Sequence, residues 1–149
     1  MIDLAEEFQA VISVLAEHGI EYAVCGGLAM AIHGLPRATV DIDLLIRPED
    51  EERVYAAVGS LEFRATPMHF DQGKMEIRRV SKFDPAGDTL MLDLLLVTSA
   101  FEDVWRDRMR IESEFGPISV VSRRGLIELK SGRMSGVDQD DIKRLRGED

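Results

Sequence analysis

Residues 22–46 read YAVCGGLAMAIHGLPRATVDIDLLI, and this stretch decides the expected fold. The run from Tyr22 to Cys25 is short and apolar, which predicts a buried strand that stops at Gly26-Gly27. The run from Leu28 to His33 predicts a short helix, which a nearby glycine and proline would close. Apolar and acidic residues then alternate with period two from Val40 to Ile46, which predicts a second strand with one apolar face.

The same periodicities predict the elements on either side of this stretch. Leu4, Phe8, Val11, Ile12 and Leu15 recur at helical spacing, and Asp3 with Glu6 resembles a capping box at the start of that helix. Further helices are expected after Pro48, over 99–107, over 123–131 with Ser122 as cap, and over 139–146 with Asp138 as cap. Strands are expected over 62–65, 74–80, 89–97, 110–114 and 118–121, with a loop over 67–73 and a turn over 84–88.

Helices and strands therefore interleave, and the expected class is α/β, with one mixed sheet and flanking helices. The length of 149 residues suits a single domain covering 1–149. No apolar run approaches the roughly 20 residues that span a bilayer, so no membrane partner is expected. The chain has one cysteine and its start lacks the features of a secretory signal, which predicts the cytoplasm. The net charge of -10 means that any contact with a polynucleotide would need a local basic patch.

Asp41 and Asp43 are the first candidates for chemistry. Two residues apart on a strand, their carboxylates project from one face about 7 Å apart along the chain. Carboxylates that close repel each other unless a cation lies between them, and Mg²⁺ is commonly held by one or two carboxylates together with substrate phosphates. The alternative is that the pair simply faces solvent at a polar strand end.

Asp93 is the third candidate, because it interrupts the most apolar stretch of the chain, Thr89 to Val97. An unpaired carboxylate buried in a central strand would cost several kcal/mol, so a metal or a basic partner must compensate it. One explanation is a salt bridge with Arg78 or Arg79. The other is that Asp93 joins Asp41 and Asp43 across neighbouring strands, as three acids around one or two metal ions do in phosphoryl transfer.

The two glycines at positions 26 and 27 lie between a predicted strand and a predicted helix. Without side chains, backbone N–H groups there can approach phosphate oxygens closely. A Gly-Gly pair is also common in ordinary turns, so its weight comes from its position one strand–helix unit before the aspartate pair.

Together these motifs resemble the nucleotidyltransferase superfamily. The match consists of Gly26-Gly27-Leu28-Ala29-Met30, then His33-Gly34, then Arg37-Ala38-Thr39-Val40-Asp41-Ile42-Asp43-Leu44, with Asp93 as the expected third acid. The Arg-x-Thr-x-Asp-Ile-Asp-Leu form is most similar to the AbiEii-like abortive-infection toxins and their small relatives. The tail, with Lys130, Arg133 and residues 138–142, also resembles that branch.

The resemblance implies a minimal nucleotidyltransferase fold that transfers a nucleoside monophosphate from a triphosphate to an acceptor hydroxyl with Mg²⁺ or Mn²⁺. The acceptor would be RNA, often tRNA, or protein, and an antitoxin could be a partner. Asp41, Asp43 and Asp93 would be catalytic and hold metal. The implied nucleotide-binding residues are Gly26, Gly27, Arg37, Thr39, Lys130 and Arg133. From the residues alone, Arg37 could equally pair with a neighbouring acid, and Lys130 and Arg133 could form a solvated basic face.

Two departures from the superfamily pattern leave a rival interpretation open. Gly27 stands where many members carry serine, which removes one side-chain contact to phosphate. The chain is also short, so a partner or a second copy would have to hold the acceptor. The rival is a binding or protein-interaction module that keeps the fold and turns nothing over.

Overall fold

The computed structural model describes residues 2–36, 38–64, 66–114, 116–133 and 136–147, with the backbone alone described at 132, 133 and 136–138. One mixed sheet of seven strands runs through it, in the order β3-β4-β5-β2-β1-β7-β6. The strands are β1 (Ala23–Cys25), β2 (Ile42–Ile46), β3 (Met68–Gln72), β4 (Met75–Phe83), β5 (Thr89–Leu96), β6 (Met109–Ser113) and β7 (Gly116–Val120). The predicted class, α/β with a mixed sheet and flanking helices, is confirmed.

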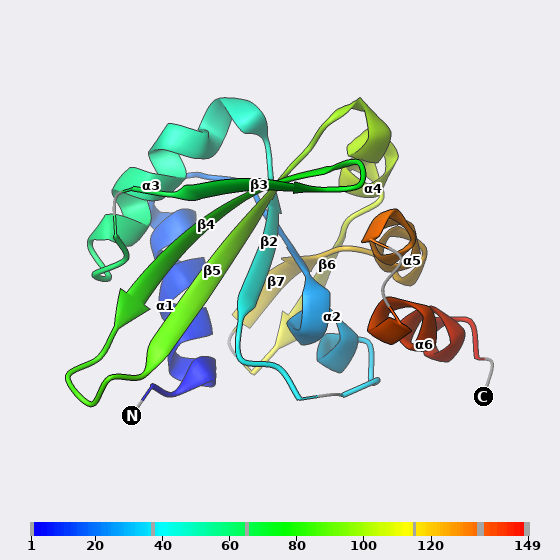
Figure 1. Cartoon of the computed structure of the whole chain (residues 1–149), viewed down its shortest axis with the longest axis horizontal. Coiled ribbons are helices and arrows are strands. Elements are labelled where there is room, and N and C mark those ends of the chain that lie inside the picture. The colour runs from blue at the N-terminus through cyan, green and yellow to red at the C-terminus, as the bar shows by residue number, and fades with distance from the viewer. Residues whose placement is uncertain (1, 37, 65, 115, 134–135, 148–149) are drawn as a thin grey trace.

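Helices pack around this sheet. They are α1 (Leu4–Glu17), α2 (Gly26–Ile32), α3 (Glu51–Gly59), α4 (Glu102–Arg106), α5 (Arg123–Arg133) and α6 (Gly136–Leu145), with short 3-10 turns η1 (Pro48–Asp50) and η2 (Ser99–Phe101). Helices α1 and α3 contact each other, while α5 contacts both α4 and α6 at the opposite end of the molecule (Figure 1). No described helix is both long and apolar enough to cross a membrane.

The centre of the sheet follows the sequence pattern closely. Strand β5 lies between β4 and β2, and its residues Leu90, Leu92 and Leu94 are fully buried. Burial of this kind contributes roughly 1.5–3 kcal/mol for each large apolar side chain, so β5 is a main source of stability. The cap of α1 is also as predicted, because the Asp3 side chain accepts a hydrogen bond from the Glu6 backbone N–H at 3.2 Å.

Three elements begin at a different residue from the one predicted. Helix α2 begins at Gly26 rather than Leu28, so the glycine pair forms its first turn. Strand β2 begins at Ile42 rather than Val40, and Val40 is 75% exposed instead of joining the apolar face. Helix α6 begins at Gly136, so Asp138 lies inside the helix instead of capping it.

Two predictions between α3 and β4 are wrong. The described part of the predicted strand over 62–65 is not a strand, because Glu62 lies in a turn with a left-handed φ of 76° and the two residues after it have no regular structure. The predicted loop over 67–73 is instead mostly strand β3, which forms a hairpin with β4. Strand β3 lies at the sheet edge with mostly exposed side chains, so it lacks the apolar alternation that marks a half-buried strand.

Candidate functional site

Three neighbouring strands place a row of charged side chains across the middle of the sheet. Asp43 on β2 lies directly beside Asp93 on the parallel strand β5, and Asp93 lies directly beside Arg79 on the antiparallel strand β4. Residues paired directly across strands point to the same face, about 5 Å apart at their backbones. The sheet therefore brings together two of the predicted acids and one arginine on a single face.

An open cavity of about 170 Å³ covers this row. Most of the predicted site residues line it, namely Gly26, Gly27, Thr39, Asp41, Asp43, Asp93 and Lys130. It is smaller than the roughly 300–1,000 Å³ of a typical small-molecule pocket, so it suits the charged end of a ligand rather than the whole of one. Five further lining residues were not predicted to be site residues, namely Phe70, Gln72, Ile77, Arg79 and Leu95.

The glycine pair allows the backbone to lie against two of the site's side chains. Gly26 has φ of +65°, and a Cβ atom placed on it would lie 2.7 Å from Cγ of Asp43. A Cβ atom on Gly27 would lie 2.7 Å from both Cβ and Oγ1 of Thr39. Side chains at these positions would displace Asp43 and Thr39, so glycine is required at both for packing. Contact with phosphate stays a prediction.

Thr39 and Asp41 lie in the segment that leads into β2. The Thr39 hydroxyl donates a long hydrogen bond of 3.4 Å to the backbone carbonyl of Asp41. Partial burial raises the pKa of the Asp41 carboxyl, the negative charge of Asp93 raises it further, and the Arg79 guanidinium opposes both effects. Like charges are therefore close enough to influence one another in this cavity.

Arg79 forms the strongest polar contact of the row. Its Nε and Nη2 atoms donate hydrogen bonds of 2.7 Å and 2.9 Å to the two carboxylate oxygens of Asp93. Its guanidinium also lies 5.1 Å from the centre of the Phe70 ring on β3, within the range of a cation–π contact. The hydrogen bonds that Arg79 donates to Asp93 and the charges of all three acids raise the pKa of Arg79, so this arginine stays charged.

The two arginines proposed from sequence as partners of Asp93 lie on opposite faces of the sheet. Arg79 pairs with Asp93, while Arg78 forms ion pairs with Glu51 at 3.5 Å and Glu76 at 3.7 Å. Alternation along β4 explains the difference, because successive side chains of a strand point to opposite faces. The salt-bridge alternative for Asp93 is therefore present in the structure, with Arg79 as the partner.

Lys130 lies at the cavity wall but not on a solvated surface. Its ammonium forms an ion pair of 2.7 Å with Asp141 of α6, and the two side chains are 2% and 5% exposed. The alternative of a solvated basic face is thus wrong for Lys130, because α6 covers it. Asp141 was part of the tail motif, but no role was predicted for it. The role of Lys130 toward a nucleotide stays a prediction.

Two of the predicted nucleotide-binding residues cannot be placed. Arg37 lies outside the described residues. Arg133 ends α5, but its side chain is not among those that the structure describes. Their expected contacts with phosphate stay predictions.

The residues of the cavity fit one divalent cation. Asp41 and Asp43 offer hard carboxylate oxygens in an open cavity, which is the donor chemistry that Mg²⁺ and Mn²⁺ take with the help of substrate phosphates. Among the residues that the structure describes, no three His, Cys, Asp or Glu side chains are grouped to hold a metal ion. Both oxygens of Asp93 are hydrogen-bonded to Arg79 instead. The assignment of metal to Asp41, Asp43 and Asp93 stays a prediction.

Solved structures with the same fold are nucleotidyltransferases by their descriptions. TM1012 of Thermotoga maritima, a candidate nucleotidyltransferase, is similar with a TM-score of 0.63 at 14% identity over 99% of this chain and 92% of that one. The lincosamide antibiotic adenylyltransferase LnuA, bound to lincomycin, gives a TM-score of 0.65 at 15% identity over 95% of each chain. ANT(2")-Ia, in complex with adenylyl-2"-tobramycin, gives 0.60 at 14% identity over 94% and 85%.

At these identities the likeness shows the fold alone, which is the nucleotidyltransferase fold that the sequence resemblance implied. No curated protein sequence matches the chain. The profile of the family described as "Nucleotidyl transferase AbiEii toxin, Type IV TA system" matches residues 11–131, which is well over half of the 149 residues. This chain therefore belongs to the AbiEii nucleotidyl transferase family.

Proposed function

We propose that this nucleotidyltransferase is metal-dependent and moves a nucleoside monophosphate from a nucleoside triphosphate to an acceptor hydroxyl. The observation that carries the proposal is the cavity in which Asp41, Asp43 and Asp93 meet Gly26, Gly27 and Lys130. Phosphoryl transfer needs mainly positioning and charge stabilisation, and a small polar cavity with closely placed acids suits that task.

The roles of the residues follow from their placement. Asp41 and Asp43 would hold a divalent cation, Mg²⁺ or Mn²⁺, which when bound would neutralise charge on the phosphate oxygens. Asp41 would take the proton of the acceptor hydroxyl, since it lies in the cavity. The acceptor oxygen then bonds to the α-phosphorus, the bond from that phosphorus to the β-phosphate breaks, and pyrophosphate leaves.

The nucleotide would be held by backbone and cationic groups at the same cavity. Gly26 and Gly27 would offer backbone N–H groups to the phosphates at the first turn of α2, with Thr39 next to them. Lys130 adds positive charge at the wall, and Arg37 and Arg133 are proposed to act on the same phosphates. LnuA and ANT(2")-Ia are described with small-molecule antibiotics, whereas the resemblance to the AbiEii-like toxins implies RNA or protein as the acceptor, which we propose for this chain.

The test is transfer of label from each α-labelled nucleoside triphosphate, with Mg²⁺ or Mn²⁺, onto total RNA and onto protein. We expect label with at least one nucleotide, and a loss of about 1,000-fold in Asp43→Asn, because the removed carboxylate would hold the cation. Asp103→Asn is the matched control, since Asp103 is 76% exposed on α4 and lies outside the cavity. Equal rates in Asp43→Asn and the wild-type protein would contradict the proposal.

A second candidate is a nucleotide-binding module without turnover, and the Arg79–Asp93 contact favours it. An arginine that occupies both oxygens of the third acid leaves one acid fewer for catalysis. The same experiment separates the two candidates. Measurable binding of a triphosphate with no transferred label from any nucleotide would support the module.

We further propose that the chain acts in the cytoplasm as the toxin of a toxin–antitoxin pair, in keeping with the description of its family. Induced expression should then arrest growth, and co-expression of a neighbouring gene should restore it. Asp43→Asn should not arrest growth. An arrest that persists in Asp43→Asn would show that an interaction surface, and not nucleotidyl transfer, causes the toxicity.

A further inference from the structure

Arg79 is a fixed cation placed among the three acids of the cavity. We infer that Arg79 takes the place of a second divalent cation, so that the site binds one cation at Asp41 and Asp43 while Asp93 anchors the arginine. This inference rests on the proposed function, since it concerns the metal content of the same site.

The first support is the geometry of the Arg79–Asp93 contact. A guanidinium matches a carboxylate with two parallel hydrogen bonds, and such charge-assisted pairs are among the strongest polar contacts in proteins. Distances of 2.7 Å and 2.9 Å show that both oxygens of Asp93 are used. For Asp93 also to bind a metal ion, the ion would have to use the remaining lone pairs of the same two oxygens, next to the guanidinium, a group of like charge.

The second support is that the arginine is held from two directions, one of them in addition to the ion pair. Asp93 faces it from the neighbouring strand β5, in direct register, and the Phe70 ring faces it from the edge strand β3. Its side chain is 26% exposed and that of Asp93 is 10% exposed, so the pair lies at the cavity wall and is largely covered. Release of the arginine would lose the cation–π contact together with the ion pair.

The third support is the charge balance of the cavity. Arg79 and Lys130 both line the cavity together with the three aspartates, so positive charge is already present at its wall. A second cation would have to lie beside the Arg79 guanidinium in a partly covered cavity, where like charges repel strongly.

The inference predicts how many metal ions the protein binds, and Mn²⁺ is the probe. The full-length protein is titrated with Mn²⁺ in the presence of the α,β-methylene analogue of each ribonucleoside triphosphate in turn. Electron paramagnetic resonance counts the bound ions and detects coupling between two ions about 4 Å apart. We expect one uncoupled Mn²⁺ per wild-type chain, and two coupled ions in Arg79→Gln, where Asp93 becomes available.

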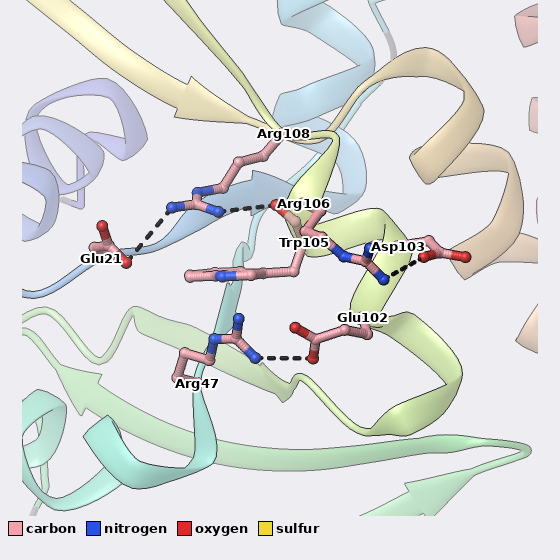
Figure 2. A network of polar contacts seen from close by, with 7 residues as sticks. All are labelled: Glu21, Arg47, Glu102, Asp103, Trp105, Arg106 and Arg108. Carbon is pink, nitrogen blue, oxygen red and sulfur yellow. Dashed lines mark hydrogen bonds and ion pairs between the residues drawn. The ribbon is translucent and has the colours of Figure 1, made fainter.

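The matched control is Arg47→Gln. Arg47 also forms an ion pair, at 2.8 Å to Glu102, and also lies over an aromatic ring, 5.3 Å from the centre of Trp105 (Figure 2). It does not line the cavity, so this variant should bind one Mn²⁺ like the wild-type protein. It therefore controls for the loss of a positive charge and of a stacked arginine in general.

A double variant guards against the chance that Arg79→Gln fails to fold with an unpaired Asp93. Arg79→Gln combined with Asp93→Asn removes both charges of the pair and keeps the net charge of the cavity, a change that proteins tolerate better than removal of one partner. We expect it to bind one Mn²⁺ with an affinity within about threefold of the wild-type value, because Asp93 is not a ligand. A loss of tenfold or more would show that Asp93 is a ligand and overturn the inference.

Each other outcome is also decisive. Two coupled ions in the wild-type protein would overturn the inference and leave the proposed function intact. One ion in a folded Arg79→Gln protein would overturn it as well. A wild-type protein that binds a nucleotide analogue but no Mn²⁺ would instead contradict the metal dependence in the proposed function.

Discussion

Two arginine–carboxylate pairs in this molecule have the same local chemistry and different surroundings. Arg79 bonds to Asp93 and lies 5.1 Å from the Phe70 ring, while Arg47 bonds to Glu102 and lies 5.3 Å from the Trp105 ring. The first pair uses two hydrogen bonds and the second uses one. The contacts alone would suggest that both pairs are structural.

The surroundings separate the two pairs. Trp105 lies between Arg47 and Arg108 (Figure 2). Arg108 forms an ion pair with Glu21 at 3.5 Å, so each arginine of this network has its own carboxylate. Arg79 instead lies near three carboxylates and donates hydrogen bonds to both oxygens of Asp93. The cation that we propose would bind among these acids, whereas we propose none at the Trp105 network.

The largest effect is expected at a third pair, which is more buried than either of these. Asp141→Asn would leave the Lys130 ammonium, 2% exposed, without its ion-pair partner at 2.7 Å. Breaking a buried pair at one end costs about 3 kcal/mol or more, so the free energy of unfolding should fall by that amount. Urea denaturation measures it, with Asp103→Asn as the exposed control. A loss no larger than that of the control would mean that burial does not set the strength of these pairs.

The next effect is on activity, and it compares the two arginine pairs directly. Asp93→Asn should slow nucleotidyl transfer by about 100-fold, because Arg79 would be free to bind Asp41 or Asp43 and compete with the cation. Glu102→Gln should change the rate by less than about twofold, since Glu102 lies outside the cavity. Initial rates of label transfer measure both variants. Similar rates for the two would place the Arg79 pair in the same structural class as the Arg47 pair.

Local sequence patterns predicted most of the secondary-structure elements around the cavity. The Asp-x-Asp pair and the single acid of the most apolar strand were placed on neighbouring strands, and they meet there in the register Asp43 to Asp93. The Asp3 cap and the turn at Asp84, where the Gly87 N–H donates to the Asp84 carbonyl at 3.0 Å, were also predicted. The individual strands, the cap and the turn depend on residues a few positions apart, which is the range over which periodicity and capping carry information.

The features of the site that the sequence did not predict depend on pairings between residues far apart in the chain. The need of Asp93 for a basic partner was evident, but only the register of β4 on β5 decides that Arg79 faces it and Arg78 does not. A shift of one residue would exchange them. Lys130 was expected to face a ligand or solvent, because nothing local indicates that α6 brings Asp141 against it. Strand β3, which supplies Phe70, was missed because an exposed edge strand needs no apolar alternation.

The smallest effect is expected for the pH dependence of the Arg47 pair. The hydrogen bond from Arg47 holds the pKa of Glu102 below its usual range of about 4.3. A lowered pKa in the folded state means that this interaction stabilises the protein above the unfolded pKa and is lost as the pH falls through the folded one. The melting temperature of Arg47→Gln should thus lie slightly below the wild-type value at pH 7, and the gap should narrow below about pH 4. A gap that stays constant down to pH 3 would show that Arg47 stabilises the fold by stacking on Trp105, which does not depend on Glu102. In that case the ion pair at the surface, unlike that of Arg79, would contribute almost nothing.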